Sequence, residues 1–185
     1  EPCAHKGKNG TSCAEIISSS GVKEVFISNC DPDLRTSGKG IEILRKSKIN
    51  VYTDLLVNEG KDLNNGYFTN FSFNRPFVTI KFAISLDGKI ALKNKNSKWI
   101  SNELSRNFGH MMRAQSDGIL TTNSTIIEDD PMLTCRLNGL ENYSPLKIII
   151  DRGLKLNGNY SILKNAKKNN LIIYHSTNDK SKINN

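Results

Sequence analysis

The sequence has no long apolar run, few cysteines and a shortage of acidic residues. No run approaches the about 18 apolar residues that a membrane-spanning helix needs, and no hydrophobic core of a secretory signal occurs in it. Its four cysteines lack the spacing of a small disulfide-linked domain. These absences argue against a membrane protein and a disulfide scaffold. They favour a reducing, cytoplasmic compartment with free or metal-bound thiols.

The shortage of acidic residues leaves a net charge of +8. A solvated surface rich in lysine explains this charge, and attraction for phosphorylated small molecules is a second explanation. Nucleic acid ranks third, because the lysines are scattered. The densest clusters, Lys93–Lys98 and Lys164–Lys168, have no interleaved aromatic residues. We therefore expect no nucleic-acid partner.

No Gly-x-Gly-x-x-Gly segment occurs, so a Rossmann dinucleotide site is not supported. The stretch Thr79–Arg136 organises the chain instead. An apolar run, Val78 to Ile84, opens it and stops at the polar turn Ser85–Gly88, and a charged helix follows. A strand that stops at Ser, Asp and Gly near the single tryptophan, Trp99, suits a ligand pocket at a strand end. On spacing alone, a core position for Trp99 is the alternative.

Residue patterns predict strands alternating with helices. In the first part we expect strands at Val22–Asn29 and Ile49–Thr53, and helices at Gly38–Lys48 and Leu55–Phe71. The segment Asn74–Arg75–Pro76 then interrupts the pattern and predicts a domain boundary.

The second part begins with a predicted strand at Phe77–Ile84. Further strands are predicted at Ser116–Thr121, Lys147–Asp151 and Leu171–Tyr174, with a helix at Glu103–Gln115 capped by Ser101 and a short helix from Asn123 or Ser124 to Ile127. The strand at Lys147–Asp151 is nearly all apolar, as expected in a sheet covered on both faces.

Three groups of residues are candidates for chemistry. Cys3 and Cys13 flank a Gly-containing loop, and thiolates suit zinc, although two free thiols explain the spacing equally well. Asp129 and Asp130 are weak candidates for an acid/base or metal-binding pair, because adjacent side chains point in different directions. Arg113 and Arg136 are better candidates, since a guanidinium binds phosphate through two parallel hydrogen bonds. A surface ion pair is the alternative for each arginine.

Four segments carry a resemblance to a known family. S-L-D-G-K-I-A, S-K-W-I-S, M-R-A-Q-S-D-G-I-L and D-D-P-M-L-T-C-R occur in that order. They resemble the reductase half of the bacterial bifunctional deaminase/reductases of riboflavin biosynthesis. The N-terminal segment resembles the zinc-binding segment of the deaminase half, with matches at Pro2, Cys3, His5, Gly7 and Cys13.

The resemblance implies an α/β chain. Residues 1–73 would be the C-terminal part of a cytidine-deaminase-like α/β/α sandwich, and 74–76 a linker. Residues 77–185 would be the N-terminal part of a dihydrofolate-reductase-like domain. The implied reactions are zinc-dependent hydrolytic deamination of a phosphoribosylamino-pyrimidine and NADPH-dependent reduction of its ribose to a ribityl chain. A homo-oligomer is expected.

The family's functional positions map onto residues of this chain. Cys3 and Cys13 would bind zinc. Ala83, Trp99, Thr125, Asp129 and Arg152 would contact NADPH, and Ser97, Arg113, Leu133 and Arg136 would bind the substrate. The family's zinc-binding His and catalytic Glu have no counterpart among residues 1–185, nor have its substrate-binding Glu and Gly-rich cofactor segment. We therefore expect a fragment that lacks both ends and is incomplete at both sites.

One departure from the family and two alternatives complete the prediction. The loop before Cys13 is one residue longer than usual and has N-G-T-S in place of T-P-P, so we expect zinc ligation to survive with a less rigid loop. This loop motivates the first alternative, a single-function reductase with a degenerate deaminase remnant. The second is a basic zinc-binding nucleic-acid module.

Overall fold

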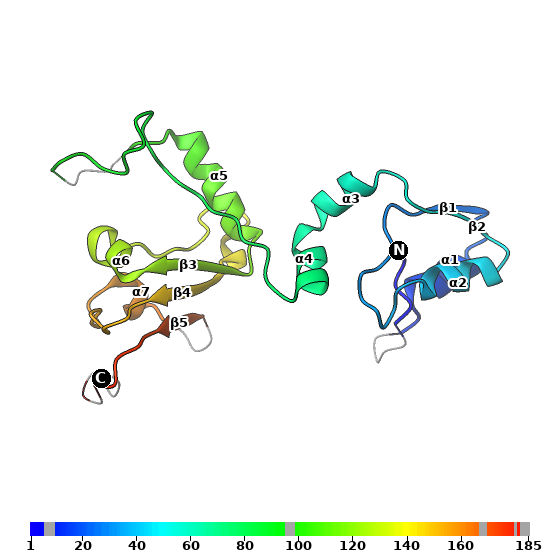
Figure 1. Ribbon diagram of the computed structural model, residues 1–185. Coiled ribbons are helices and arrows are strands. Elements are labelled where there is room, and N and C mark those ends of the chain that lie inside the picture. The colour runs from blue at the N-terminus through cyan, green and yellow to red at the C-terminus, as the bar shows by residue number, and fades with distance from the viewer. Residues whose placement is uncertain (6–9, 95–98, 167–169, 180, 182–185) are drawn as a thin grey trace. The chain divides into compact units, whose positions relative to one another are not determined.

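The computed structural model describes residues 1–5, 10–94, 99–166, 170–179 and 181. The chain divides into two compact units, Glu1–Ile80 and Lys81–Asn185 (Figure 1). Both contain parallel strands joined through helices, so the predicted α/β class is confirmed. The sequence-based boundary at residues 74–76 stays a prediction. Among the described residues, no helix has the length and apolar character needed to cross a membrane.

The first unit is built on one β-α-β crossover. Its elements are α1 (Cys13–Ser19), β1 (Glu24–Phe26), α2 (Lys39–Lys46), β2 (Asn50–Tyr52), α3 (Val57–Leu63) and α4 (Asn65–Phe73). Strands β1 and β2 pair in parallel, and α2 supplies the connection that parallel pairing requires. Helix α1 lies beside α2 (Figure 1), and Ala14, Ile41 and Leu44 are buried there.

The single helix predicted at Leu55–Phe71 is two helices in the structure. Asn64 separates them, with a non-helical backbone at φ −123° and ψ 29°. Its side chain donates a hydrogen bond to the Gly60 carbonyl over 3.1 Å. Asparagine offers the backbone such a local alternative to continuing a helix, and a periodicity argument does not detect it.

The carboxylate of Glu1 caps α2. Gly38, the N-cap residue, has no side chain to do so and adopts φ 77°. The Glu1 oxygens accept hydrogen bonds from the amides of Asp31 (2.9 Å), Gly38 (3.0 Å) and Gly40 (2.9 Å). The N-terminal segment is thereby attached to the start of α2 and to the turn after β1.

Glu1→Ala is expected to lower the free energy of unfolding by about 2–3 kcal/mol, because main-chain amides at the start of α2 and in the turn after β1 lose a charged acceptor. Urea denaturation followed by circular dichroism measures the change. Glu59→Ala is the matched control, since Glu59 is an exposed carboxylate in the first turn of α3. Equal losses in the two variants would contradict the capping role.

The second unit contains a three-stranded parallel sheet. Its elements are α5 (Glu103–Ala114), β3 (Gly118–Thr122), α6 (Asn123–Asp129), the 3-10 helix η1 (Glu141–Tyr143), β4 (Leu146–Ile150), α7 (Ser161–Lys164) and β5 (Leu171–Tyr174). The strand order is β3-β4-β5. The core joins Ile126 of α6, Leu133, Ile149 of β4 and Ile162 of α7, so α6 and α7 cover the same face of the sheet.

The other face of this sheet is largely exposed among the described residues. Side chains alternate along a strand, so Leu120, Ile172 and Tyr174 lie opposite the core, with 62%, 39% and 60% of their surface exposed. The expectation of a sheet covered on both faces is therefore wrong for this part of the chain. An apolar strand sequence indicates that both faces of the strand can be buried, but it does not identify the elements that would cover them.

The strand predicted at Phe77–Ile84 is wrong as well. No described residue pairs with this segment, and Val78, Ile80 and Phe82 are 65–71% exposed. A β-strand forms only where a second strand provides hydrogen-bond partners for its backbone groups. The apolar pattern indicates only that the segment favours an extended conformation. The following turn is confirmed, because the Gly88 amide donates to the Ser85 carbonyl over 2.9 Å and Gly88 adopts φ 75°.

Helix α5 begins at Glu103, as predicted, but its N-cap lies one residue later than expected. Asn102, not Ser101, is the N-cap, and its side chain accepts a hydrogen bond from the Ser105 amide over 2.9 Å. Both residue types cap helices well, so the sequence alone does not discriminate between them. The helix therefore begins at Glu103, which places His110 and Arg113 in its last two turns.

Candidate functional site

Two arginines predicted to bind phosphate meet around a histidine. Arg113 and His110 lie three residues apart on α5 and therefore share one face of the helix. The Arg136 amide donates to His110 Nδ1 over 3.2 Å, and Arg113 Nη1 donates to the Thr134 carbonyl over 3.1 Å. The end of α5 and the segment 134–136 are thus tied together, although they are distant in sequence.

The electrostatics of this cluster favour an anion. Partial burial, and then the nearby charge of Arg136, lower the pKa of the Arg113 guanidinium, while Cys135 acts in the opposite direction. Within the described part of the chain, no carboxylate forms an ion pair with either arginine. Two neighbouring cations without a counter-charge repel each other, and a bound phosphate would relieve that repulsion through bidentate hydrogen bonds.

The other two predicted substrate residues differ in what the structure shows. Leu133 is 6% exposed, adopts φ 53°, and packs in the core against Ile126, Ile149 and Ile162. It anchors the segment that carries Arg136, and its predicted contact with a pyrimidine stays a prediction. Ser97 lies outside the described residues.

Three residues predicted to contact NADPH lie on the segments that follow the carboxyl ends of β3 and β4. Thr125 and Asp129 are four residues apart on α6, which follows β3 directly. Thr125 is half-buried and Asp129 is exposed, and Arg152 is an exposed residue just after β4. Ligands of parallel sheets commonly bind at this edge.

Buried Asp151 holds this edge together. Its Oδ1 accepts from the Asn123 side chain over 3.0 Å, and its Oδ2 accepts from the amides of Lys155 (2.7 Å) and Leu156 (2.9 Å). The first residue of α6 is thereby joined to the loop that contains Arg152. In the sequence Asp151 is only the end of a predicted strand, because the pattern does not show that a carboxylate there is fully buried.

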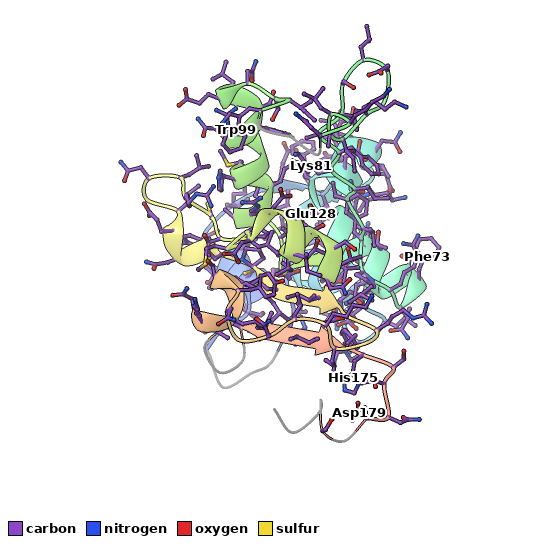
Figure 2. All side chains as sticks on the ribbon, turned by 90° about the vertical axis from the view of Figure 1, so that its left-hand side faces the viewer. Phe73, Lys81, Trp99, Glu128, His175 and Asp179 are labelled. Carbon is purple, nitrogen blue, oxygen red and sulfur yellow. The ribbon has the colours of Figure 1, made fainter. Side chains whose placement is uncertain are left out.

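The remaining two predicted cofactor residues lie on other segments. Trp99 is 68% exposed in the turn that precedes α5 (Figure 2), and the Arg106 guanidinium lies 4.5 Å from the centre of its ring. Ala83 is half-buried within the unpaired segment after Ile80. The available groups are an exposed indole, a carboxylate and a guanidinium, and these fit a ligand with an aromatic ring, ribose hydroxyls and phosphates.

Cys3 and Cys13 lie together in the first unit. A capping box between Ser12 and Glu15 fixes the start of α1, and Cys13 is its first residue. The Cys13 amide donates to Cys3 Sγ over 3.4 Å. This main-chain hydrogen bond, and then one from the Cys13 thiol, lower the pKa of Cys3. The thiol hydrogen bond raises the pKa of Cys13.

Two sulfurs fit half of a tetrahedral zinc site. The described residues include no cluster of three or more His, Cys, Asp or Glu placed to hold a metal ion. The fit is therefore limited to the two predicted cysteines, and His5 does not complete it.

His5 instead lines a basic depression of about 370 Å³ with Ala4, Arg35, Thr36 and Lys39. The Arg35 guanidinium donates three hydrogen bonds to Asp33, over 2.9, 3.1 and 2.7 Å, which lower the pKa of Asp33 to about 2. In the sequence His5 was predicted only as a residue of the loop between Cys3 and Cys13. Nothing in the pattern of Arg35 and Lys39 distinguished them from surface residues.

Comparison with known proteins identifies relatives of both units. Residues 76–185 match the family model described as the RibD C-terminal domain. The riboflavin biosynthesis protein RibD of Aquifex aeolicus is 35% identical over 98% of this chain and 50% of its own length. That of Bacillus amyloliquefaciens is 40% identical over 83% of this chain and 41% of its own length. The chain thus spans about half the length of the curated relatives it matches.

Solved structures agree with these matches. RibD of Acinetobacter baumannii superposes on this chain with a TM-score of 0.84 at 30% sequence identity. The match includes 100% of this chain and 52% of the Acinetobacter chain. A structure from Thermotoga maritima superposes with a TM-score of 0.85 at 36% sequence identity. The match includes 97% of this chain and 50% of the Thermotoga chain. The Thermotoga protein is described as a diaminohydroxyphosphoribosylaminopyrimidine deaminase/5-amino-6-(5-phosphoribosylamino)uracil reductase.

Proposed function

The chain belongs to the RibD C-terminal domain family, and from this membership we propose that its second unit forms part of an NADPH-dependent reductase of riboflavin biosynthesis. The proposed substrate is 5-amino-6-(5-phosphoribosylamino)uracil, the compound that the Thermotoga protein's description names. One observation carries this assignment. Arg113 and Arg136 lie together, and no carboxylate in the described part of the chain pairs with either, which suits a site for the substrate phosphate.

The chain's residues have separate roles in this proposal. Arg113 and Arg136 bind the phosphate, and Leu133, with Ser97, contacts the rest of the substrate. NADPH is held by Ala83, Trp99, Thr125, Asp129 and Arg152. When bound, the cofactor supplies the hydride for reduction of the ribose to a ribityl chain. The residues of the chain contribute mainly by orienting the two ligands, since hydride transfer depends on their alignment.

A second activity is proposed for the first unit, which would be the C-terminal part of a cytidine-deaminase-like domain. Its support is the close approach of Cys3 and Cys13 and the Aquifex match, which extends over nearly the whole chain. Cys3 and Cys13 would hold zinc, and bound zinc would activate water for deamination of the pyrimidine. The basic depression at His5 and Lys39 suits a phosphorylated ligand.

We also propose that the protein is cytoplasmic and that it associates with further copies of itself.

The reductase proposal is tested by isothermal titration of the full chain with the phosphorylated substrate and with the same compound lacking its phosphate. We expect the phosphorylated compound to bind at least about tenfold more tightly, because charge-assisted hydrogen bonds contribute about 1.5–3 kcal/mol. Dihydrofolate should not compete. Equal affinities for the two pyrimidines would refute the phosphate assignment, and competition by dihydrofolate would refute the substrate assignment.

A further inference from the structure

His110 stands at the centre of the arginine cluster, and no role in binding was predicted for it. Its side chain is buried on α5, with 9% of the residue's surface exposed. Two donors approach the same ring nitrogen, Nδ1. The Arg136 amide lies 3.2 Å away and Arg113 Nη1 lies 3.4 Å away. The imidazole therefore contacts the main chain beside one arginine and the guanidinium of the other.

These contacts determine the protonation state of the ring. Neither donor can accept a hydrogen bond, because a backbone amide and a guanidinium nitrogen carry only N–H groups toward Nδ1. Nδ1 must therefore carry the lone pair, which leaves the proton of the neutral ring on Nε2. A proton added to Nδ1 would face two N–H groups and would break the hydrogen bond to Arg136.

The charges around His110 act in the same direction. Burial first, and then the positive charges of Arg113 and Arg136, lower the pKa of His110, while a hydrogen bond with the main chain of Thr134 opposes them. Helix η1, which packs against α5, carries Glu141 and Tyr143, and neither is among the groups that shift this pKa. The neutral imidazole is thus the form that the folded chain favours.

We propose that neutral His110 is a positioning residue that holds Arg113 and Arg136 in one phosphate-binding geometry, and that its protonation disrupts this geometry. This inference rests on the proposed function of the arginine cluster. His110 does not touch the phosphate. It acts through the main chain of Arg136 and the side chain of Arg113, so its loss should weaken anion binding and leave NADPH binding nearly unchanged.

The same geometry makes stability depend on pH. As the pH falls, the unfolded chain takes up the proton first, since the folded pKa lies below the unfolded one. The stabilising contribution is therefore complete above about pH 6.5 and is lost as the pH falls from there through the folded pKa.

The test measures sulfate binding to the full chain by isothermal titration, because the charge of sulfate does not change over the range used. We compare wild type with His110→Leu, which removes the acceptor, and with His110→Asn, whose Oδ1 occupies nearly the position of Nδ1. An NMR titration of the imidazole gives the pH at which His110 gains its proton. Affinity is then measured above and below that pH.

We expect His110→Leu to weaken sulfate binding about tenfold, the effect of about 1.4 kcal/mol. His110→Asn should stay within about threefold of wild type and should lose the pH dependence. Wild-type affinity should fall when His110 is protonated. Tighter binding on protonation would overturn the inference, because it would mean that His110 contacts the anion directly. If His110→Leu does not fold, His110→Asn and the wild-type pH comparison still decide the matter.

Failure of the inference and failure of the proposed function give different results. If wild type binds neither sulfate nor the phosphorylated pyrimidine at any pH, the phosphate site itself is refuted. If wild type binds both and His110→Leu binds as tightly as wild type, only the positioning role of His110 is refuted.

Discussion

Replacing Arg136 with alanine is expected to weaken binding of the phosphorylated pyrimidine by about 10- to 100-fold, because a charge-assisted hydrogen bond contributes about 1.5–3 kcal/mol. The substitution should not disturb the fold. Arg136 contacts His110 through its main-chain amide, which alanine retains, and its side chain is exposed. Stability should therefore change by no more than about 0.5 kcal/mol. Removing this side chain also removes a charge that repels Arg113.

Isothermal titration with the pyrimidine and separately with NADPH measures the effect. NADPH affinity should remain within about twofold of wild type, since none of the predicted cofactor residues is Arg136, and three of the five lie on α6 or just after β4. Arg45→Ala is the matched control, because Arg45 is an exposed arginine of α2 in the other unit. Similar losses of pyrimidine and NADPH affinity in Arg136→Ala would refute its assignment to the phosphate.

Asp151→Ala is expected to lower the free energy of unfolding of the second unit by about 3–5 kcal/mol, because three donors lose a fully buried acceptor at once. Those donors are the Asn123 side chain and the amides of Lys155 and Leu156. Asp151 itself is completely buried, so water cannot replace the carboxylate without local opening. The start of α6 and the loop after β4 should lose their connection first.

Urea denaturation and hydrogen exchange at the amides of β4 and α6 measure this loss. Exchange resolves the second unit from the first, which matters because two units need not unfold together. Asp151→Asn should lose an amount of unfolding free energy between zero and the loss in Asp151→Ala. Its side-chain amide keeps one acceptor oxygen, but its NH₂ group faces N–H donors and cannot accept from them. Asp117→Ala is the control at an exposed aspartate next to β3. A loss no larger than the control's would show that the buried carboxylate does not organise this edge.

Much of the local structure is predictable from sequence because it depends on neighbouring residues. The strand at Leu171–Tyr174 has the predicted bounds, and those at β1 and β2 lie within the predicted ranges. The turn at Ser85–Gly88 also follows from residue types, since Gly88 adopts the positive φ that glycine favours. The division of Leu55–Phe71 at Asn64 was missed, because a side-chain hydrogen bond outweighed the helical periodicity there.

The candidate site was predictable only in part. Arg113 and Arg136 were chosen for guanidinium chemistry and for a resemblance, and their proximity came from the fold. His110 had only a weak signal, its position three residues before Arg113 on the same helix. Asp151 had none, because burial of a carboxylate depends on donors that lie 4, 5 and 28 residues away in sequence.

The sequence by itself determined the α/β class, the order of most elements and the family, since periodicity, turn residues and ordered motifs are all local features of the chain. The tertiary structure alone decided which segments pair and which side chains meet. Phe77–Ile84 has the pattern of a strand and no partner among the described residues, whereas His110 and Arg136 meet across 26 positions. The physical reason is that a strand or a binding site is completed by groups from elsewhere in the chain, and local preference does not specify those groups.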